Sequence, residues 1–95
     1  MHNKTIIVTG GSSGIGRACA AAFGRDGGRI IITGRNQARL HEAAEYLRRH
    51  VADVLPVVAD VSREDDCRRV VNMAVAAGGG IDVLINNAGI SMRAL

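Results

Sequence analysis

Short apolar runs alternate along the chain with longer segments in which apolar residues recur every three or four positions. The runs are rich in isoleucine and valine and have few polar residues at their centres. This pattern is typical of strands that are covered on both faces. Strands are therefore predicted at residues 4–9, 29–33, 54–58 and 81–86.

The segments between these runs have the periodicity of helices that pack one face on a sheet. The first helix is predicted from about Ile15 and ends at glycines that start with Gly24. Asn36 is a candidate N-cap for the second helix. Residues 62–65 resemble a capping box for the third helix, which ends at the glycines of 78–80. The predicted inward faces are Ile15, Ala18, Cys19, Ala22 and Phe23, then Leu40, Ala43, Ala44, Leu47 and Val51, then Cys67, Val70, Val71 and Ala74.

Strands and helices that alternate with short connections predict parallel strands and right-handed crossovers. The expected fold is a partial, doubly wound α/β sheet of strand order 3-2-1-4. Pro56 agrees with an edge position for the third strand, because proline cannot donate to a ladder. The fourth strand is expected to be an open edge, and the tail at 90–95 carries no terminating signal. The first two helices would cover one face and the third the other, so Cys19 and Cys67 could not form a disulfide.

A glycine-rich turn, TGGSSGIG at residues 9–16, follows the first apolar run directly. Strand, tight turn and helix make half of a βαβ unit. Gly10 is expected to turn the chain sharply, while Gly14 and Gly16 leave room for a ligand and a neighbouring strand. The N-terminus of the following helix adds free N–H groups and a partial positive charge, which favour phosphate. The alternative is a loop that needs its glycines only for its own geometry.

The amino-acid composition and the net charge limit the class of protein and its partners. The 95 residues suffice for one domain, and the 47% apolar content with 2% aromatics predicts an aliphatic core. The net charge of +3 is spread without a basic run, so we expect no nucleic-acid partner. No apolar run reaches the roughly 18 residues of a membrane span, and no signal segment precedes the first strand. These features predict a cytoplasmic protein without a membrane partner.

Cysteine and histidine usage predicts no metal site. The two cysteines, Cys19 and Cys67, lie on apolar helix positions and are expected to be buried, reduced thiols. His2, His41 and His50 have no metal-ligand spacing with them. We expect these histidines to be surface residues.

Three motifs in order are similar to those of one known family. They are the glycine turn at 9–16, Asp60 just after the third strand, and NNAG at 86–89 closing the fourth. Together they resemble the N-terminal, cofactor-binding half of the short-chain dehydrogenases/reductases, over essentially all 95 residues. The resemblance implies a Rossmann-type fold and an NAD(P)-dependent oxidoreductase that interconverts a carbonyl and an alcohol. It also implies a small-molecule substrate and leaves a homo-oligomer open for the intact enzyme.

The resemblance also implies the cofactor-binding residues. The turn at 10–15 would hold the pyrophosphate and adenosine ribose, Asp60 and Val61 would lie along the adenine, and Asn87 would contact the central ribose region. Two alternatives stay open, since Asp60 could cap or precede the third helix and the two asparagines could only stabilise the strand end. The candidate site residues are Gly10, Gly11, Ser12, Ser13, Gly14, Ile15, Gly16, Arg35, Asp60, Val61, Asn87, Ala88 and Gly89.

The choice of cofactor follows from charge at the end of the second strand. NAD-selective enzymes usually place an acid there to accept from the ribose 2′-OH. Here the position is Gly34, followed by Arg35, whose planar cation suits a 2′-phosphate. The sequence therefore favours NADP over NAD, unless Arg35 is only a surface charge. Ser13 adds no second cation, and the charges of the second helix, Arg39 among them, are expected to form a solvated face only.

No catalytic residue is predicted in these 95 residues. The resemblance implies a serine and a tyrosine with a lysine four positions later, but Tyr46 is followed four positions on by His50. We therefore expect a single dinucleotide-binding half-domain over 1–95, truncated at its C-terminus and inactive on its own. The alternatives are a non-catalytic nucleotide-binding remnant or module, and an interaction fragment that docks its fourth strand on a partner.

Overall fold

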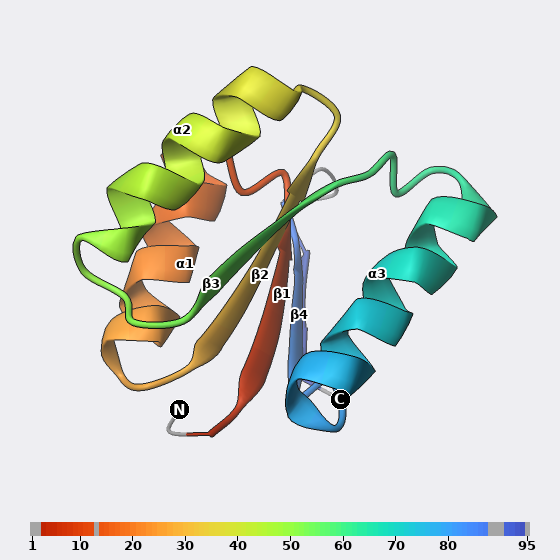
Figure 1. Ribbon diagram of the computed structural model, residues 1–95. Helices are drawn as coiled ribbons and strands as arrows, with labels where there is room; N and C mark the ends of the chain where they lie inside the picture. The colour runs from red at the N-terminus through yellow and green to blue at the C-terminus, as the bar shows by residue number, and fades with distance from the viewer. Residues whose placement is uncertain (1–2, 13, 88–90, 95) are drawn as a thin grey trace.

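The computed structural model describes residues 3–12, 14–87 and 91–94, which form a layered α/β structure (Figure 1). The strands form one sheet of order β3-β2-β1-β4-β5. The elements in chain order are β1 (Thr5–Thr9), α1 (Gly14–Arg25), β2 (Arg29–Gly34), α2 (Gln37–Arg48), β3 (Val54–Val58), α3 (Glu64–Gly78), β4 (Val83–Asn86) and β5 (Ser91–Ala94).

The predicted strand order 3-2-1-4 is confirmed. β1 pairs in parallel with β2 on one side and with β4 on the other, and β2 pairs in parallel with β3. Helices α1 and α2 cover one face of the sheet, and α3 covers the opposite face (Figure 1). Pro56 lies on β3, which is an edge strand as expected. The carboxyl ends of β1, β2 and β3 thus lie together at one edge of the sheet.

Two aliphatic cores separate the layers, because successive strand residues point to opposite faces. Ile6 and Ile30 pack with α1 and α2, whereas Ile7 and Ile31 pack with α3. Cys19 belongs to the first layer and Cys67 to α3, and both are free, half-buried cysteines. They lie on opposite faces of the sheet, which confirms that they cannot pair.

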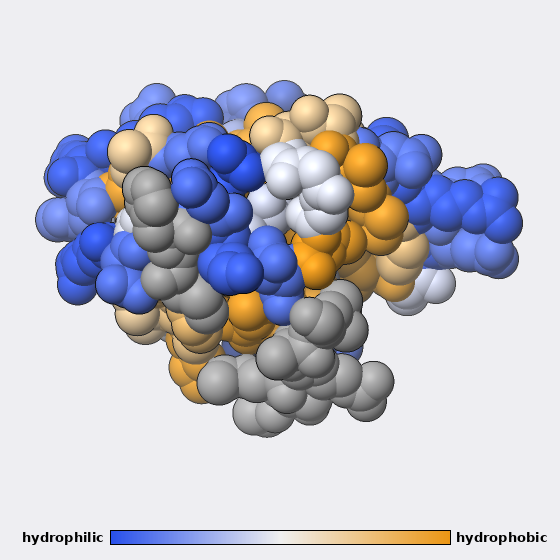
Figure 2. Space-filling view, turned by 90° about the horizontal axis from the view of Figure 1, so that it is seen from below, coloured by the Kyte–Doolittle hydropathy of each residue, from blue (hydrophilic) through white to orange (hydrophobic). Residues whose placement is uncertain are grey.

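Helix α3 leaves part of its sheet face uncovered. A hollow of about 300 Å³ between α3 and the sheet is lined by apolar residues that include Ile7, Val70 and Leu84. Val71, predicted to face inward, is 43% exposed, and Val75 is 49% exposed. Figure 2 shows apolar surface in the middle of the molecule, flanked on both sides by hydrophilic residues.

The expectation of an open edge at β4 is wrong. Residues 91–94 form β5, which pairs antiparallel with β4 and extends the sheet by one strand. Unpaired N–H and C=O groups along β4 favour any chain segment that can reach them. The tail, for which the sequence analysis predicted no element, is therefore part of the sheet.

The inward face predicted for the first helix is confirmed only in part, since Cys19 and Phe23 pack against the core but Ala18 and Ala22 are exposed. Ile15 is 66% exposed, and the buried residues are Gly16, Ala20, Ala21 and Gly24. A Cβ at Gly24 would collide with the side chain of Val51. The helix therefore packs closely through its smallest residues, whereas the predicted stripes of the second helix are buried as expected.

Helix α2 begins as predicted, but α3 does not. The Asn36 Oδ1 atom accepts a hydrogen bond from the Arg39 N–H at 3.0 Å, which confirms the N-cap of α2. The N-cap of α3 is Arg63 and makes no side-chain capping bond, so the predicted capping box is wrong. The Ser62 hydroxyl instead donates to the Asp60 carboxylate at 2.6 Å.

Candidate functional site

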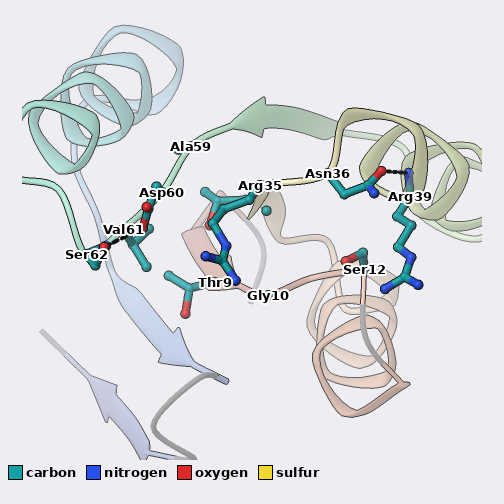
Figure 3. Close-up of a pocket in the computed structure, with 12 residues that line it drawn as sticks. Thr9, Gly10, Ser12, Arg35, Asn36, Arg39, Ala59, Asp60, Val61 and Ser62 are labelled. Atoms are coloured by element: carbon teal, nitrogen blue, oxygen red, sulfur yellow. Dashed lines mark hydrogen bonds between the residues drawn. The ribbon is translucent and has the colours of Figure 1, made fainter.

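A cleft of about 490 Å³ lies over the carboxyl ends of β1, β2 and β3 (Figure 3). Ligands of doubly wound sheets bind at this edge, where strand ends and helix N-termini meet. The cleft collects predicted site residues from three separate parts of the chain. Its lining residues are Thr9, Gly10, Ser12, Thr33, Gly34, Arg35, Asn36, Arg39, Ala59, Asp60, Val61 and Ser62.

The glycine turn forms one wall of the cleft and has the geometry that its sequence predicts. Gly10 has φ of 69°, a left-handed conformation that side chains disfavour, and its N–H donates to the Thr33 carbonyl at 2.9 Å. A Cβ at Gly16 would lie 2.5 Å from the Gly10 carbonyl oxygen. A Cβ at Gly14 would have no atom of the described chain within 4 Å. Gly16 is thus required by the turn itself, while the space beside Gly14 is open.

The end of β4 is tied to this turn. The Asn87 side-chain amide donates to the Gly10 carbonyl at 3.2 Å. The Thr9 hydroxyl donates to the Asn86 Oδ1 atom at 3.1 Å and is within 3.3 Å of the Ile85 carbonyl. Both asparagines therefore stabilise the strand ends. Their contact with a cofactor stays a prediction, and Ser13, Ala88 and Gly89 lie outside the described residues.

The end of β2 carries no acid. A Cβ at Gly34 would lie 3.7 Å from the Ser12 hydroxyl oxygen and 3.5 Å from a methyl carbon of Leu40. These are ordinary contact distances, so the position has room for a side chain but holds none. Arg35 follows at once and lines the cleft (Figure 3).

Arg39 is the residue that sequence reasoning missed. It was expected on a solvated face only, but it lines the cleft together with Arg35. Helix α2 begins at Gln37, directly after β2, so its first turn lies at the carboxyl edge of the sheet. The short spacing between the end of the strand and Arg39 was the signal that could have identified it.

Asp60 and Val61 form the wall of the cleft that follows β3. The Asp60 carboxylate accepts from the Ser62 hydroxyl at 2.6 Å and from the Ser62 N–H at 3.0 Å. These bonds lower the pKa of Asp60 from its ordinary value, with smaller contributions from Arg35 and Arg63. Asp60 precedes α3 without capping it and presents an ionised carboxylate, which can only accept hydrogen bonds.

Replacing Ser62 by alanine is expected to raise the pKa of Asp60 toward its ordinary value, because the largest cause of its lowering is the Ser62 hydroxyl. The depressed pKa of the folded state contributes stability above the unfolded value, and that contribution disappears as the pH falls through the folded pKa. NMR titration of the Asp60 carboxyl carbon measures the shift. An unchanged titration in the alanine variant would contradict the assignment.

Outside the cleft, the part of the chain that the structure describes was examined for a metal site, a membrane-spanning helix and a catalytic tyrosine. No group of three histidine, cysteine or acidic residues there could hold a metal ion. None of the described helices is both long and apolar enough to cross a membrane. Tyr46 packs edge-on against His50 at 5.5 Å between ring centroids, and the Arg17 guanidinium lies 4.7 Å from its ring. Tyr46 is not among the residues that line the cleft.

A protein-family model described as short chain dehydrogenase matches residues 4–95. The chain belongs to the short-chain dehydrogenase family. The match confirms the resemblance that the three motifs indicated, and it extends over both walls of the cleft.

Individual members of the short-chain dehydrogenase family are similar over nearly the whole chain. An 11-beta-hydroxysteroid dehydrogenase 1A of Arabidopsis thaliana is 40% identical over 92 residues, which are 96% of this chain and 26% of that protein. The crystal structure of a Caenorhabditis elegans glucose dehydrogenase matches with a TM-score of 0.85 and 37% identity, over 90% of this chain and 38% of that one. The structure of L-sorbose reductase from Gluconobacter frateurii with NADPH and L-sorbose matches with a TM-score of 0.86 and 40% identity, over 94% and 34%. The chain thus spans about a quarter to two fifths of these relatives.

The described residues of this short-chain dehydrogenase fit the dinucleotide that the family binds. The open space at Gly14 and the left-handed Gly10 leave the glycine turn accessible to a phosphate. Arg35 and Arg39 supply positive charge at the end of β2, where Gly34 carries no carboxylate. The end of β2 therefore brings positive charge to the cleft and no carboxylate of its own.

Proposed function

We propose that this chain is the cofactor-binding part of an NADP(H)-dependent oxidoreductase that interconverts a carbonyl and an alcohol. Membership of the short-chain dehydrogenase family supports the oxidoreductase class. A similar protein, L-sorbose reductase, has been solved with NADPH. When bound, NADPH supplies the hydride. The part of this chain is to bind and orient the adenosine end of the cofactor.

One observation carries the choice of NADPH over NADH. Gly34 stands where an NAD-selective enzyme has its acid, and a side chain there would contact the Ser12 hydroxyl. Because Gly34 has no carboxylate, a 2′-phosphate would meet no repulsion from this position. Arg35 lines the same end of the cleft and supplies the opposite charge.

We further propose that the catalytic groups are not among these 95 residues, so that the chain alone is inactive. Its tyrosine, Tyr46, lacks the lysine four positions later that the family resemblance implies. The substrate would be a small carbonyl or alcohol compound, and the intact enzyme would act in the cytoplasm. Oxidation of NADPH by a panel of carbonyl compounds, measured with the complete gene product, tests this activity. A complete product that binds NADPH but oxidises it with no carbonyl compound would favour the non-catalytic module.

Replacing Arg35 by alanine is expected to weaken NADPH binding selectively, by roughly 1.5–3 kcal/mol, the range of hydrogen bonds to charged groups. NADH should bind nearly as before, because it lacks the 2′-phosphate. Calorimetric titration of both nucleotides against the variant and the unmodified chain measures the difference.

Arg49 provides the matched control for Arg35. It is exposed and lies at the opposite end of α2, so Arg49→Ala removes the same charge without touching the cleft. If Arg35→Ala lowers the affinities for NADPH and NADH equally, the assigned role of Arg35 is contradicted. If Arg35→Ala and Arg49→Ala lower the affinity for NADPH equally, only the net charge of the chain matters for binding.

A further inference from the structure

The outer edge of β3 is bordered by α2 on one face of the sheet and by α3 on the other (Figure 1). Successive residues of a strand direct their N–H and C=O groups alternately to its two sides. The Asp53 carbonyl accepts from the Ile30 N–H at 2.9 Å, so position 53 faces β2. The Ala59 N–H donates to the Gly34 carbonyl at 3.0 Å, so position 59 faces β2 as well. The even-numbered residues of β3 therefore direct their backbone groups outward.

Two arginine side chains occupy carbonyl groups on this outer side. The Arg48 guanidinium, from the last turn of α2, donates to the Val54 carbonyl at 3.3 Å. The Arg69 guanidinium, from α3, donates to the Val58 carbonyl at 2.6 Å. The third outward-facing residue is Pro56, which has no N–H to donate. Each of these three strand residues thus lacks one of the two groups with which a further strand would pair.

The Arg69 side chain is held at the strand edge by its own helix. Its guanidinium lies 3.7 Å from one carboxylate oxygen of Asp66, which is three residues earlier in α3. The other oxygen of Asp66 accepts from the Asp60 N–H at 2.7 Å, just beyond the end of β3. Asp66 therefore fixes the arginine and the strand end relative to each other.

The composition of β3 favours addition of a further strand. Its five residues, VLPVV, are apolar and uncharged, and Val58 is 38% exposed. Apolar, uncharged segments of high β-propensity at a sheet edge are templates for pairing with another chain. Charged side chains and proline are the means by which such edges are protected. At β3 the proline lies within the strand, while the charges come from the two helices beside it.

We propose that Arg48, Pro56 and Arg69 close the β3 edge to strand addition by a second copy of this chain. A second β3 can pair with this edge only if both guanidinium groups leave their carbonyls, and it would still find no N–H at the central position. Assembly of copies of this protein therefore uses surfaces other than the β3 edge.

The test removes these three features and measures self-association. A double variant combines Arg48→Ala with Arg69→Ala, and a triple variant adds Pro56→Val. The matched control combines Arg49→Ala with Arg68→Ala, which removes two exposed positive charges next to the edge arginines in sequence. Analytical ultracentrifugation over a concentration series measures the mass of each variant. NMR-detected hydrogen exchange follows the backbone amides of β3, and circular dichroism verifies the fold.

The mass of the triple variant is expected to rise with concentration toward about twice that of a single chain, since a two-fold pairing of two β3 edges closes a dimer. The double variant should show the same rise at higher concentration, and the control should sediment like the unmodified chain. The amides of Val54 and Val58 should exchange more slowly in the associated variants, because they become hydrogen-bonded between the copies.

Sedimentation of the triple variant like the unmodified chain, with unchanged exchange at Val54 and Val58, would overturn the proposal. Equal association of the control would assign the effect to lost charge, and association without slower exchange in β3 would assign it to another surface. Either result would overturn the proposal too. If the triple variant does not fold, the double variant, which leaves the strand sequence unchanged, is judged by the same outcomes.

Discussion

Replacing Gly34 by aspartate is expected to reverse the nucleotide preference of the chain from NADPH to NADH. A Cβ at this position would lie at ordinary contact distances, 3.7 Å from the Ser12 hydroxyl oxygen and 3.5 Å from Leu40. Gly34 does not have the left-handed φ found at Gly10, so a side chain causes no backbone strain. The variant should therefore fold like the unmodified chain.

The new carboxylate would repel a 2′-phosphate and accept a hydrogen bond from a ribose 2′-hydroxyl. Because like charges in contact cost several kcal/mol, NADPH affinity should fall by roughly a hundredfold or more. NADH affinity should rise by about tenfold, the size of one hydrogen bond to a charged group. Calorimetric titration with both nucleotides measures the change.

Gly34→Asn is the matched control, since asparagine has nearly the same shape as aspartate without its charge. We expect the asparagine variant to lose much less NADPH affinity. If both variants lose NADPH equally, the end of β2 excludes the phosphate by shape and the argument from charge is wrong. If neither variant changes the preference, the 2′-phosphate does not lie at this end of the cleft.

Replacing Gly16 by alanine is expected to destabilise the chain by roughly 2–3 kcal/mol, as overpacking of a tight site does. The added Cβ would lie 2.5 Å from the Gly10 carbonyl and 3.2 Å from the Asn87 side-chain nitrogen. The same Gly10 carbonyl accepts the hydrogen bond from the Asn87 side chain. A shift of this carbonyl would therefore also disturb the contact between the glycine turn and the end of β4. Urea unfolding followed by circular dichroism measures the loss, and nucleotide affinity should fall with it.

Gly14 supplies the control for this prediction. It lies two residues earlier in α1, and a Cβ there would have no described atom within 4 Å. Gly14→Ala should therefore be at least as stable as the unmodified chain, because alanine is the better helix former. Equal destabilisation of the two variants would mean that helix α1 does not approach the turn as closely as the structure has it.

The sequence predicted those features that depend on local chemistry. Ile and Val runs identified the four parallel strands, and Pro56 was consistent with β3 at the edge. Asn36 caps α2 as its residue type suggests, and Gly10 adopts the left-handed turn. Each of these depends on one residue and its immediate neighbours in the chain.

The features that were not predicted depend on contacts between distant segments. β5 pairs with β4, and its four residues are too short a segment to predict a strand without that partner. The buried face of α1 is set by Val51, which leaves no room for a side chain at Gly24. Ser62 looks like a helix cap in sequence but donates to Asp60 instead. Arg39 lines the cleft because α2 starts close to the end of β2. A start one helical turn later would place it elsewhere.

The most direct test of the account is to titrate this chain with NADPH and with NADH in the same buffer and at the same ionic strength. The glycine turn, Gly34 and Arg35 predict that both nucleotides bind and that NADPH binds at least about tenfold more tightly, in line with one charge-assisted interaction. Binding of neither nucleotide would contradict the assignment of the cleft. Equal or tighter binding of NADH would contradict the role given to the end of β2.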